Sequence, residues 1–202
     1  MIRGALFCLL ASGSAMAQDL PAAFRVTGVG AEDVLNIRQA PNAASEKIGE
    51  IGPYGVNIEV LALSENGRWG KIGMPEGNGW IAMRYLAPQE LTADEGIPRP
   101  ISCLGAEPFW RLGLYPGGDE FERMGEERVD LRPKSEKPGE DGWQASFGTR
   151  DSATYGLVVV RGLCGDGMSD REFGWRATMY IDKADGSDTL QGCCTLDHRA
   201  AP

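Results

Sequence analysis

Three carboxylates in the second half of the chain lie in short, motif-like segments and are candidates for acid–base chemistry. Glu107 precedes a proline, and Asp166 and Asp170 belong to the segment Cys-Gly-Asp-Gly-Met-Ser-Asp. Two carboxylates can hydrolyse a glycosidic bond when one acts as the acid and the other as nucleophile or base. The same residues suit a structural role, because Asp-Gly is typical of a turn and Ser169 or Asp170 can cap the connection that follows. The sequence favours the structural role and leaves hydrolysis as the alternative.

The chain has a single histidine, His198, and it lies near the C-terminus, where chains fray. Zinc hydrolases need several histidine or carboxylate ligands around an open coordination position. Cysteine peptidases need a free thiolate paired with a histidine, and a serine triad through His198 lacks a G-x-S-x-G segment in the mature chain. We therefore predict no catalytic residue, no metal site and no cofactor.

The first 17 residues have the three parts of a secretory signal peptide. Arg3 gives the positive charge, residues 5–10 form an apolar run, and Ala-Met-Ala at 15–17 is a cleavage site. The run is shorter than the roughly 20 residues that a membrane-spanning helix needs. Cys8 lies inside the run instead of after small residues, so a lipid-bearing cysteine is not indicated. We expect cleavage after Ala17 and a periplasmic or secreted protein.

The remaining cysteines, all beyond residue 100, indicate disulfides. An even number of cysteines in an exported protein is typical of disulfide pairing, and their spacing does not form the C-x-x-C clusters of zinc sites. A bond between the neighbours Cys193 and Cys194 would close a strained ring of eight atoms. Two pairings stay open, and in each Cys103 and Cys164 bond to one member of the adjacent pair.

The charge of the chain argues against two classes of partner. The formal net charge is −9, and no basic patch or later apolar span interrupts the sequence. An acidic protein is repelled by nucleic-acid phosphates and by anionic lipid surfaces. We expect no nucleic-acid partner and no membrane insertion after removal of the signal peptide.

These residues must be positioned mainly by strands. Between residues 22 and 87, Val56, Ile58 and Val60 alternate with polar residues, which is typical of a half-buried strand, and Asn66-Gly67 is a hairpin turn. Short strands broken by turns predict a small barrel here. The acidic, proline-bearing stretch 89–100 is predicted to be a linker.

The second half also has the pattern of strands. Alternation over Trp175, Ala177, Met179 and Ile181 predicts a two-faced strand, and a similar alternation buries Trp110 with the leucines that follow it. The apolar run Leu157–Val160 predicts a strand buried on both faces. We expect a short helix or a loop over Asp119–Arg128 and an exposed loop over Pro133–Asp141.

Residues 33–86 resemble the bacterial SH3-like (SH3b) domain. The resemblance is carried by Leu-Asn-Ile-Arg at 35–38, Gly-Arg-Trp-Gly-Lys-Ile at 67–72 and Gly-Trp-Ile-Ala-Met-Arg-Tyr-Leu at 79–86, in that order. SH3b domains are small exported barrels attached to cell-wall proteins. The resemblance implies an SH3b domain over residues 18–88 that docks on peptidoglycan or on an envelope protein.

The same resemblance indicates three ligand-binding residues, each with a structural alternative. Arg38 can meet a peptide carboxylate through its planar guanidinium, or it can be a structural ion-pair partner. Trp69 can pack a sugar ring or a peptide side chain, or it can pack the hairpin. Tyr54 lies at a turn tip and is expected to be exposed. Trp80, the other indole of this part, is expected in the core.

A second resemblance begins at Cys103. The segments Gly-Ala-Glu-Pro-Phe-Trp at 105–110, Cys-Gly-Asp-Gly-Met-Ser-Asp at 164–170 and Gly-Cys-Cys at 192–194 are similar to a family of exported, uncharacterised proteobacterial proteins. That family adds location and fold without an activity. It implies the pairs Cys164–Cys193 and Cys103–Cys194.

We therefore expect an all-β protein: a small SH3-like barrel over residues 18–88, a linker over 89–100, and a disulfide-bonded antiparallel β barrel or sandwich over 101–202. The expected function is docking in the cell envelope without catalysis. The alternatives are a carboxylate-based cell-wall hydrolase that uses the C-terminal part, and an inhibitor-like periplasmic binding protein.

Overall fold

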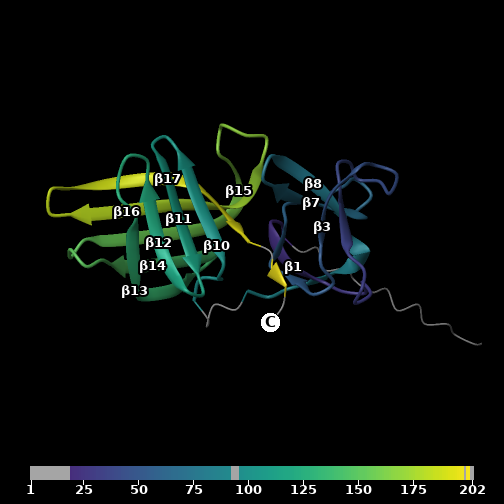
Figure 1. Ribbon diagram of the computed structural model, residues 1–202, viewed down its shortest axis with the longest axis horizontal. Helices are drawn as coiled ribbons and strands as arrows, with labels where there is room; N and C mark the ends of the chain where they lie inside the picture. The colour runs from purple at the N-terminus through teal and green to yellow at the C-terminus, as the bar shows by residue number, and fades with distance from the viewer. Residues whose placement is uncertain (1–18, 92–95, 198, 201–202) are drawn as a thin grey trace, which may run out of the picture.

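The computed structural model describes residues 19–91, 96–197 and 199–200, and the regular structure in these ranges is almost entirely β (Figure 1). The predicted signal peptide and His198 lie outside the described residues. Two separate clusters of buried side chains divide the strands into an N-terminal and a C-terminal unit. The prediction of an all-β chain is confirmed. Among the described residues, no helical segment has the length and hydrophobicity of a membrane span.

The N-terminal unit consists of two small sheets around one core. One sheet has the order β5-β1-β9 and the other the order β3-β2-β8-β7-β6. A short 3₁₀ helix, Met83–Tyr85, connects them. The strands are β1 Ala22–Val26, β2 Leu35–Arg38, β3 Lys47–Ile51, β4 Gly55–Val56, β5 Ile58–Val60, β6 Ala62–Leu63, β7 Trp69–Met74, β8 Gly77–Ala82 and β9 Leu86–Pro88.

Alternating apolar residues build this core. Leu35 and Ile37 on β2 point inward and are buried with Ile72 and Ile81 from the neighbouring strands. Gly79 faces Ile37 so closely that a side chain at this position would collide with it. The small residue therefore lets β8 lie flat against β2.

The C-terminal unit is a closed, antiparallel barrel of eight strands. Consecutive strands pair along the chain, and β10 closes the barrel by pairing with β17. This settles the predicted choice between a barrel and a sandwich. The strands are β10 Ile101–Ala106, β11 Phe109–Tyr115, β12 Gly118–Arg123, β13 Val129–Gly139, β14 Gly142–Gly148, β15 Thr154–Gly165, β16 Glu172–Lys183 and β17 Gly186–Leu196.

The barrel interior is filled by side chains from alternate positions. Trp110 on β11 and Trp175 on β16 are buried, as their alternation predicts, together with the aromatic rings of Phe121, Phe147 and Tyr155. An eight-stranded barrel has an interior just wide enough for such a filling. Little space remains between the strands themselves.

The expectation of a helix or loop over Asp119–Arg128 is wrong for residues 119–123 and holds for residues 124–128, which form a loop. Residues 118–123 form β12, which pairs with β11 on one side and β13 on the other. Phe121 points into the core while Met124, beyond the strand, is exposed. The two side chains therefore do not form one helical face, and one inward aromatic residue with flanking glutamates follows the period of a strand.

The expected loop over Pro133–Asp141 is also wrong, because most of it belongs to β13. Beyond residue 131, β13 pairs only with β14, and the register shifts between Pro133 and Ser135. Proline lacks a backbone N–H, so it is tolerated where one side of a strand has no neighbour or where a bulge interrupts pairing. The segment is exposed, as predicted, but it is extended and paired.

Burial of Leu157–Val160 on both faces is not observed. Leu157 and Val159 are buried, whereas the side chain of Val160 is 44% exposed. These residues lie on β15, whose other face is the outside of the barrel. A single closed sheet has one buried face, so a continuous apolar run leaves every second side chain near solvent.

Both disulfides that the second resemblance implies are present. Cys103 on β10 pairs with Cys194, and Cys164 on β15 pairs with Cys193. Neighbouring residues of a strand point to opposite faces, so Cys193 and Cys194 on β17 form disulfides with different cysteines.

Residues of the stretch predicted as a linker contact both units. The side chain of Gln89 donates to Asn57 Oδ1 over 2.7 Å in the N-terminal unit. Ile97 is buried in the barrel cluster. Arg99 forms ion pairs with Asp119 on β12 and with Glu136 on β13. The chain is therefore attached to a unit at each end of this stretch.

The two units also contact each other directly. Lys71 on β7 pairs with Glu172 on β16 at 2.8 Å, and Asn78 on β8 donates to the carbonyl of Asp170 over 2.7 Å. After the barrel closes, the chain returns to the N-terminal unit, where β18, Arg199–Ala200, pairs with β4.

A buried carboxylate lies at the centre of this contact. Glu59 on β5 accepts the backbone N–H of Gly174 over 2.8 Å and that of Leu196 over 3.1 Å. Burial raises the pKa of Glu59 to about 7, although the hydrogen bonds from Leu196 and Gly174 oppose this. One side chain of the N-terminal unit thus joins two strands of the barrel.

Candidate functional site

Arg38 and Trp69, two of the three residues predicted to bind a ligand, line one hollow of the N-terminal unit. The hollow has a volume of about 200 Å³ and also includes Asp33, Arg84 and Tyr85. Arg38 is the last residue of β2 and Trp69 the first residue of β7. Strands from different parts of the chain therefore bring a guanidinium and an indole together.

The position of Trp69 is set by the hairpin turn before it. The N–H of Gly67 donates to the carbonyl of Ser64 over 2.8 Å, and the N–H of Trp69 donates to Ser64 Oγ over 3.1 Å. Gly67 has a φ of 66°, which glycine adopts without strain. The Asn-Gly turn thus determines where β7 begins and positions the half-buried indole of Trp69, its first residue.

The guanidinium of Arg38 is hydrogen-bonded to the loop that follows β2. Arg38 Nη1 donates to the carbonyl of Ser45 over 2.8 Å. Ser45 Oγ in turn accepts the N–H of Ala40 over 2.9 Å. This bond uses one of the five N–H donors of the guanidinium and leaves the others for a ligand. The loop pre-orients the side chain in the hollow.

Sequence reasoning missed further groups at this site. Arg84 lies with its guanidinium carbon 4.7 Å from the ring centre of Tyr85 and donates to the hydroxyl of the same residue over 3.1 Å. An adjoining hollow of about 750 Å³ shares Trp69 and Arg84 with the first and adds Arg68. We call the two hollows together the arginine groove; its charged and aromatic residues are Asp33, Arg38, Arg68, Trp69, Arg84 and Tyr85.

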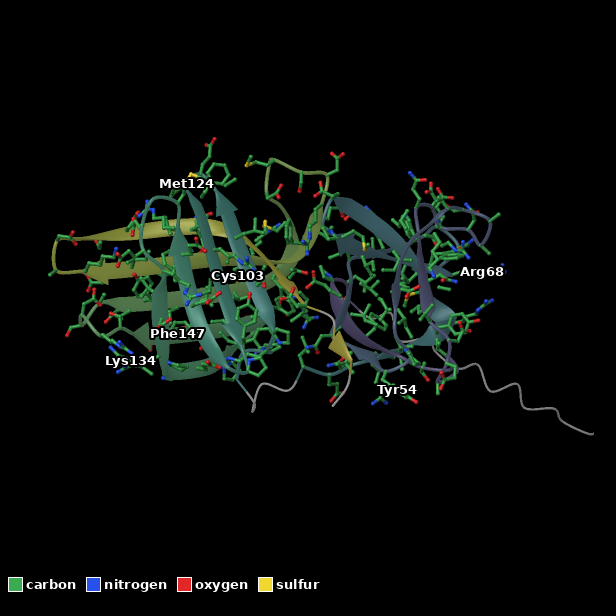
Figure 2. All side chains as sticks on the ribbon, in the orientation of Figure 1. Tyr54, Arg68, Cys103, Met124, Lys134 and Phe147 are labelled. Carbon is green, nitrogen blue, oxygen red and sulfur yellow. A yellow bond between two sulfur atoms is a disulfide. The ribbon has the colours of Figure 1, made fainter. Side chains whose placement is uncertain are left out.

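Tyr54 lies elsewhere. It is in the turn between β3 and β4, its side chain is 60% exposed, and it lines neither hollow. Figure 2 shows Arg68 at the end of the unit that faces away from the barrel, and Tyr54 on another edge. The structure thus brings Arg38 and Trp69 together and leaves Tyr54 apart from them.

The three candidate carboxylates of the barrel do not converge. Glu107 and Asp166 line a common groove on the outside of the barrel, and Asp170 is not among its lining residues. Asp166 accepts the N–H groups of Met168 and Ser169 and the hydroxyl of Ser169, each over 2.9 Å. Burial acts to raise the pKa of Asp166, but these hydrogen bonds outweigh it and lower the pKa. This pattern is the turn-bracing role that the sequence favours.

In the described ranges, no group of three histidine, cysteine, aspartate or glutamate side chains is arranged to hold a metal ion. Two carboxylates, Glu107 and Asp166, line the barrel groove, but Asp166 is engaged by the hydrogen bonds of its own turn and not free to act as acid, nucleophile or base. The N-terminal arginine groove is the better candidate for function.

The arginine groove lies within a segment of known type. Residues 33–87 match the family model of the bacterial SH3 domain. The match begins at Asp33 and includes every charged and aromatic residue of the groove. No curated protein and no solved structure matches the chain. We refer to the N-terminal unit as the SH3 domain from here on, and the resemblance of the barrel to an exported proteobacterial family stays a prediction.

Proposed function

We propose that the protein works in the cell envelope, outside the cytoplasm, and that its SH3 domain binds peptidoglycan or an envelope protein without catalysis. The observation that carries the proposal is the arginine groove inside the SH3 match, where Arg38, Arg68 and Arg84 line the same two hollows as Trp69. The two disulfides of the barrel support an oxidising location, periplasmic or secreted.

The groove suits a ligand with carboxylates. Guanidinium groups bind carboxylates through paired hydrogen bonds, and the indole of Trp69 offers a flat apolar surface beside them. Peptidoglycan contains peptide stems with free carboxylates and sugar rings that can pack on an indole. We expect an affinity between roughly micromolar and millimolar, because a small groove buries little area against the entropy lost on association.

Sedimentation with purified peptidoglycan tests the proposal on the full mature protein. We expect Arg38→Ala and Trp69→Ala to reduce the bound fraction about tenfold, because each removes a group that contacts the ligand. Tyr54→Ala is the matched control, since it removes an exposed aromatic ring outside the groove. The circular dichroism spectra of the variants check that the fold is kept.

Two results would contradict the proposal. If the wild-type protein stays in the supernatant and shows no chemical-shift change with stem peptides, the domain does not bind the wall. If Tyr54→Ala loses binding as strongly as Trp69→Ala, the arginine groove is not the site. Because the mature chain is acidic, non-specific attraction to anionic wall polymers is not expected, and true binding should persist in moderate salt.

A further inference from the structure

The barrel groove, on the outer face of the barrel, contains one of the two disulfides. Its volume is about 760 Å³, and residues of four neighbouring strands, β15, β16, β17 and β10, form its floor. Pairing in register places Val160, Arg176, Cys193 and Leu104 side by side on these strands. Paired residues share one face of a sheet, so these side chains all point to the outside of the barrel and line the groove.

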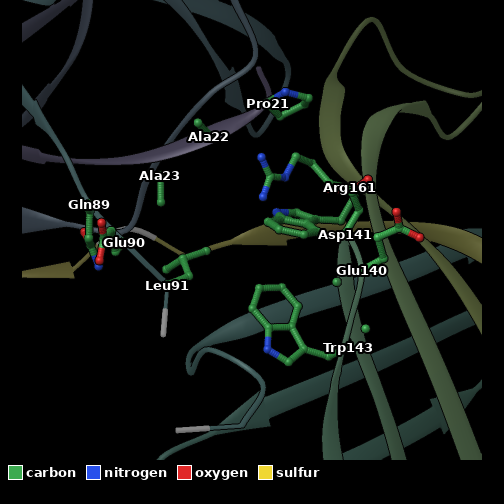
Figure 3. A pocket seen from close by; sticks show the side chains of 13 residues that line it. Pro21, Ala22, Ala23, Gln89, Glu90, Leu91, Glu140, Asp141, Trp143 and Arg161 are labelled. Carbon is green, nitrogen blue, oxygen red and sulfur yellow. The ribbon is translucent and has the colours of Figure 1, made fainter. Parts of the chain in front are cut away.

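A bulge in β15 brings Cys164 to this groove. The pairing of β15 with β16 shifts its register between Arg161 and Cys164. Before the shift, Arg161 lines another hollow, of about 400 Å³, between the SH3 domain and the barrel (Figure 3). After the shift, Cys164 lines the barrel groove and forms the disulfide with Cys193. A bulge often redirects a side chain in this way, and here it places a disulfide at the outer surface.

The two disulfides differ in their exposure to solvent. Cys103 and Cys194 are both 0% exposed and belong to the core of the barrel. Cys193 is 1% exposed, but its partner Cys164 is partly exposed. Thiol exchange begins when a thiolate attacks one sulfur of a disulfide, so the reaction needs access to one of the two cysteines. In the folded protein, a thiol can therefore approach the Cys164–Cys193 bond from the side of Cys164, whereas the Cys103–Cys194 bond is enclosed.

Arg176 lies beside the cysteine that leaves in such an attack. It is the register partner of Cys193, and its Nε donates to the carbonyl of Leu163 over 3.2 Å. In the part of the chain that the structure describes, no carboxylate forms an ion pair with Arg176. When a thiolate attacks Cys164, Cys193 leaves as a thiolate. A neighbouring cation stabilises that charge and makes the disulfide easier to open.

Apolar side chains beside the disulfide provide a contact surface for a protein. Val160 is 44% exposed and Met168 is 67% exposed, and both line the groove. Its carboxylates are Glu107 and Asp166, and three hydrogen bonds of its own turn hold Asp166. Exposed apolar side chains with polar residues around them are typical of interaction sites. The groove can therefore hold the protein segment that carries an attacking thiolate to Cys164.

We propose that the Cys164–Cys193 disulfide is a thiol-exchange site, which a protein dithiol reduces after binding in the barrel groove. One thiolate of the partner attacks Cys164 Sγ, so that a bond forms between these two sulfurs and the Cys164–Cys193 bond breaks. Cys193 leaves as a thiolate and takes up a proton. The partner's second thiolate attacks its own sulfur in the mixed disulfide, and Cys164 leaves and takes up a proton in turn. The partner is oxidised to a disulfide, and this chain gains two electrons and two protons.

Reduction at this site weakens the contact between the barrel and the SH3 domain. The disulfide fixes the start of the segment that connects β15 to β16 to strand β17. The end of that segment binds Asn78 of the SH3 domain twice: the carbonyl of Asp170 accepts from the Asn78 side chain over 2.7 Å, and the N–H of Glu172 donates to Asn78 Oδ1 over 3.1 Å. Without the bond to Cys193 the segment has more freedom to leave Asn78.

Reduction of the full mature, oxidised protein under native conditions tests the proposal. The probes are dithiothreitol and thioredoxin, a protein with a reducing dithiol. Freed thiols are alkylated at intervals and located by peptide mass spectrometry. We expect Cys164 and Cys193 to be labelled at least about tenfold faster than Cys103 and Cys194, because the second pair reacts only when the barrel opens. A thioredoxin whose second cysteine is replaced by serine should be trapped as a mixed disulfide on Cys164.

Variants separate the role of the charge from that of the docking surface. We expect Arg176→Gln to slow reduction by both probes about threefold, because the leaving thiolate loses its cation, and Arg176→Lys to restore most of the rate. Arg150→Gln is the matched control, since Arg150 is an exposed arginine outside the groove. Met168→Ser should slow thioredoxin but not dithiothreitol, which needs no docking surface. Trp69→Ala, which should reduce wall binding, is expected to leave all these rates unchanged, so the two proposals fail separately.

Two outcomes overturn the inference. The first is labelling of all four cysteines at one common rate, because the Cys164–Cys193 bond would then open only when the whole barrel unfolds. The second is the failure of the serine variant of thioredoxin to form a mixed disulfide with Cys164, because a protein dithiol would then not reach the site. Both results come from the unaltered protein, so they do not depend on whether a variant folds.

Discussion

At the scale of single residues, Glu59 is the group with the most strongly altered chemistry. It is a buried carboxylate whose oxygens accept backbone N–H groups from two barrel strands. Glu50, Arg171 and Asp197 are the other charged residues that line the same hollow. Burial raises the pKa of Glu59 from 4.5 to about 7, so the folded protein holds this proton more tightly than the unfolded chain does.

This pKa predicts how stability depends on pH. The contribution of Glu59 is fully present below pH 4.5 and is lost as the pH rises to about 7. The loss amounts to about 3 kcal/mol in the free energy of unfolding. Glu59→Gln keeps an acceptor and cannot ionise. We expect the variant to match the wild type near pH 4.5 and to exceed its stability near pH 8, measured by urea denaturation.

The difference in free energy of unfolding between Glu59→Gln and the wild type, taken at each pH, cancels the contribution of all other titrating groups. Glu65→Gln is the matched control, because Glu65 is an exposed carboxylate that does not line this hollow. Its stability difference from the wild type should stay nearly constant with pH. A Glu59→Gln difference that is equally flat between pH 4.5 and 8 would show that Glu59 does not titrate in this window.

Arg99 is the second residue whose environment makes a prediction. Hydrogen bonds from Arg99 to Glu136 and to Asp119 raise the pKa of the guanidinium. The Asp119 side chain is only 3% exposed, so it depends on Arg99 for its charge partner. We expect Arg99→Ala to lower the free energy of unfolding by on the order of 3 kcal/mol, because a buried carboxylate loses its cation.

Urea denaturation at pH 7 measures this effect. Adding Asp119→Asn to Arg99→Ala should recover part of the loss, since the unpaired charge is then gone. Replacement of the exposed Arg150 by alanine should change stability by less than about 0.5 kcal/mol. If Arg99→Ala behaves like the Arg150 variant, the ion pairs of Arg99 contribute nothing measurable.

At the scale of elements, the two disulfides share one strand and close loops of different length. Cys193 and Cys194 lie side by side on β17, and the sequence separations to their partners are 29 and 91 residues. In the chain-entropy model, the shorter loop stabilises by about 3.6 kcal/mol and the longer by about 4.6 kcal/mol. This difference predicts that the Cys103–Cys194 bond contributes more to the free energy of unfolding than the Cys164–Cys193 bond does.

We expect the double variant Cys103→Ser and Cys194→Ser to unfold at lower urea concentration than Cys164→Ser and Cys193→Ser. The buried sulfur atoms of the first pair add to the effect, because serine hydroxyls in the core would lack partners. Reductant should lower the urea midpoint of the wild-type protein below the midpoints of both double variants. The opposite order of the two midpoints would contradict the entropy argument.

Strands with clear alternation could be predicted from the sequence, and strands formed mainly by pairing could not. Trp175 to Ile181 shows its period in the side chains alone. In β12 a single aromatic residue, Phe121, points inward, and β13 is mostly exposed beyond Leu131. Their strand structure comes from hydrogen bonds to the adjacent strands β11, β13 and β14, and the side-chain pattern alone does not reveal this pairing.

The residues of the candidate site also divide into those that the sequence indicates and those that only the fold reveals. Arg38 and Trp69 could be found because each lies in a segment that resembles the SH3b domain. Arg68 and Arg84 lie in those segments as well, but only the folded arrangement shows that they line the same hollow as Trp69.

At the scale of the whole molecule, the direct contacts raise the question of how independent the two units are. The proline-bearing stretch and the cysteines on one side of it predict separable domains. The structure adds a buried carboxylate, the Lys71–Glu172 ion pair and the pairing of β18 with β4 between the units. We infer that the units fold around separate cores and stay associated through this interface.

A protein with a specific protease site inserted after Leu91 tests this inference. After cleavage under native conditions, the two fragments should elute together in gel filtration, because their interface does not depend on the connecting chain. Cleaved protein that also carries Lys71→Ala and Asn78→Ala should already separate at a protein concentration at which the cleaved wild type stays associated, since two polar contacts with the barrel are removed. Immediate separation of the cleaved wild type would instead mean that only the covalent connection holds the two units together.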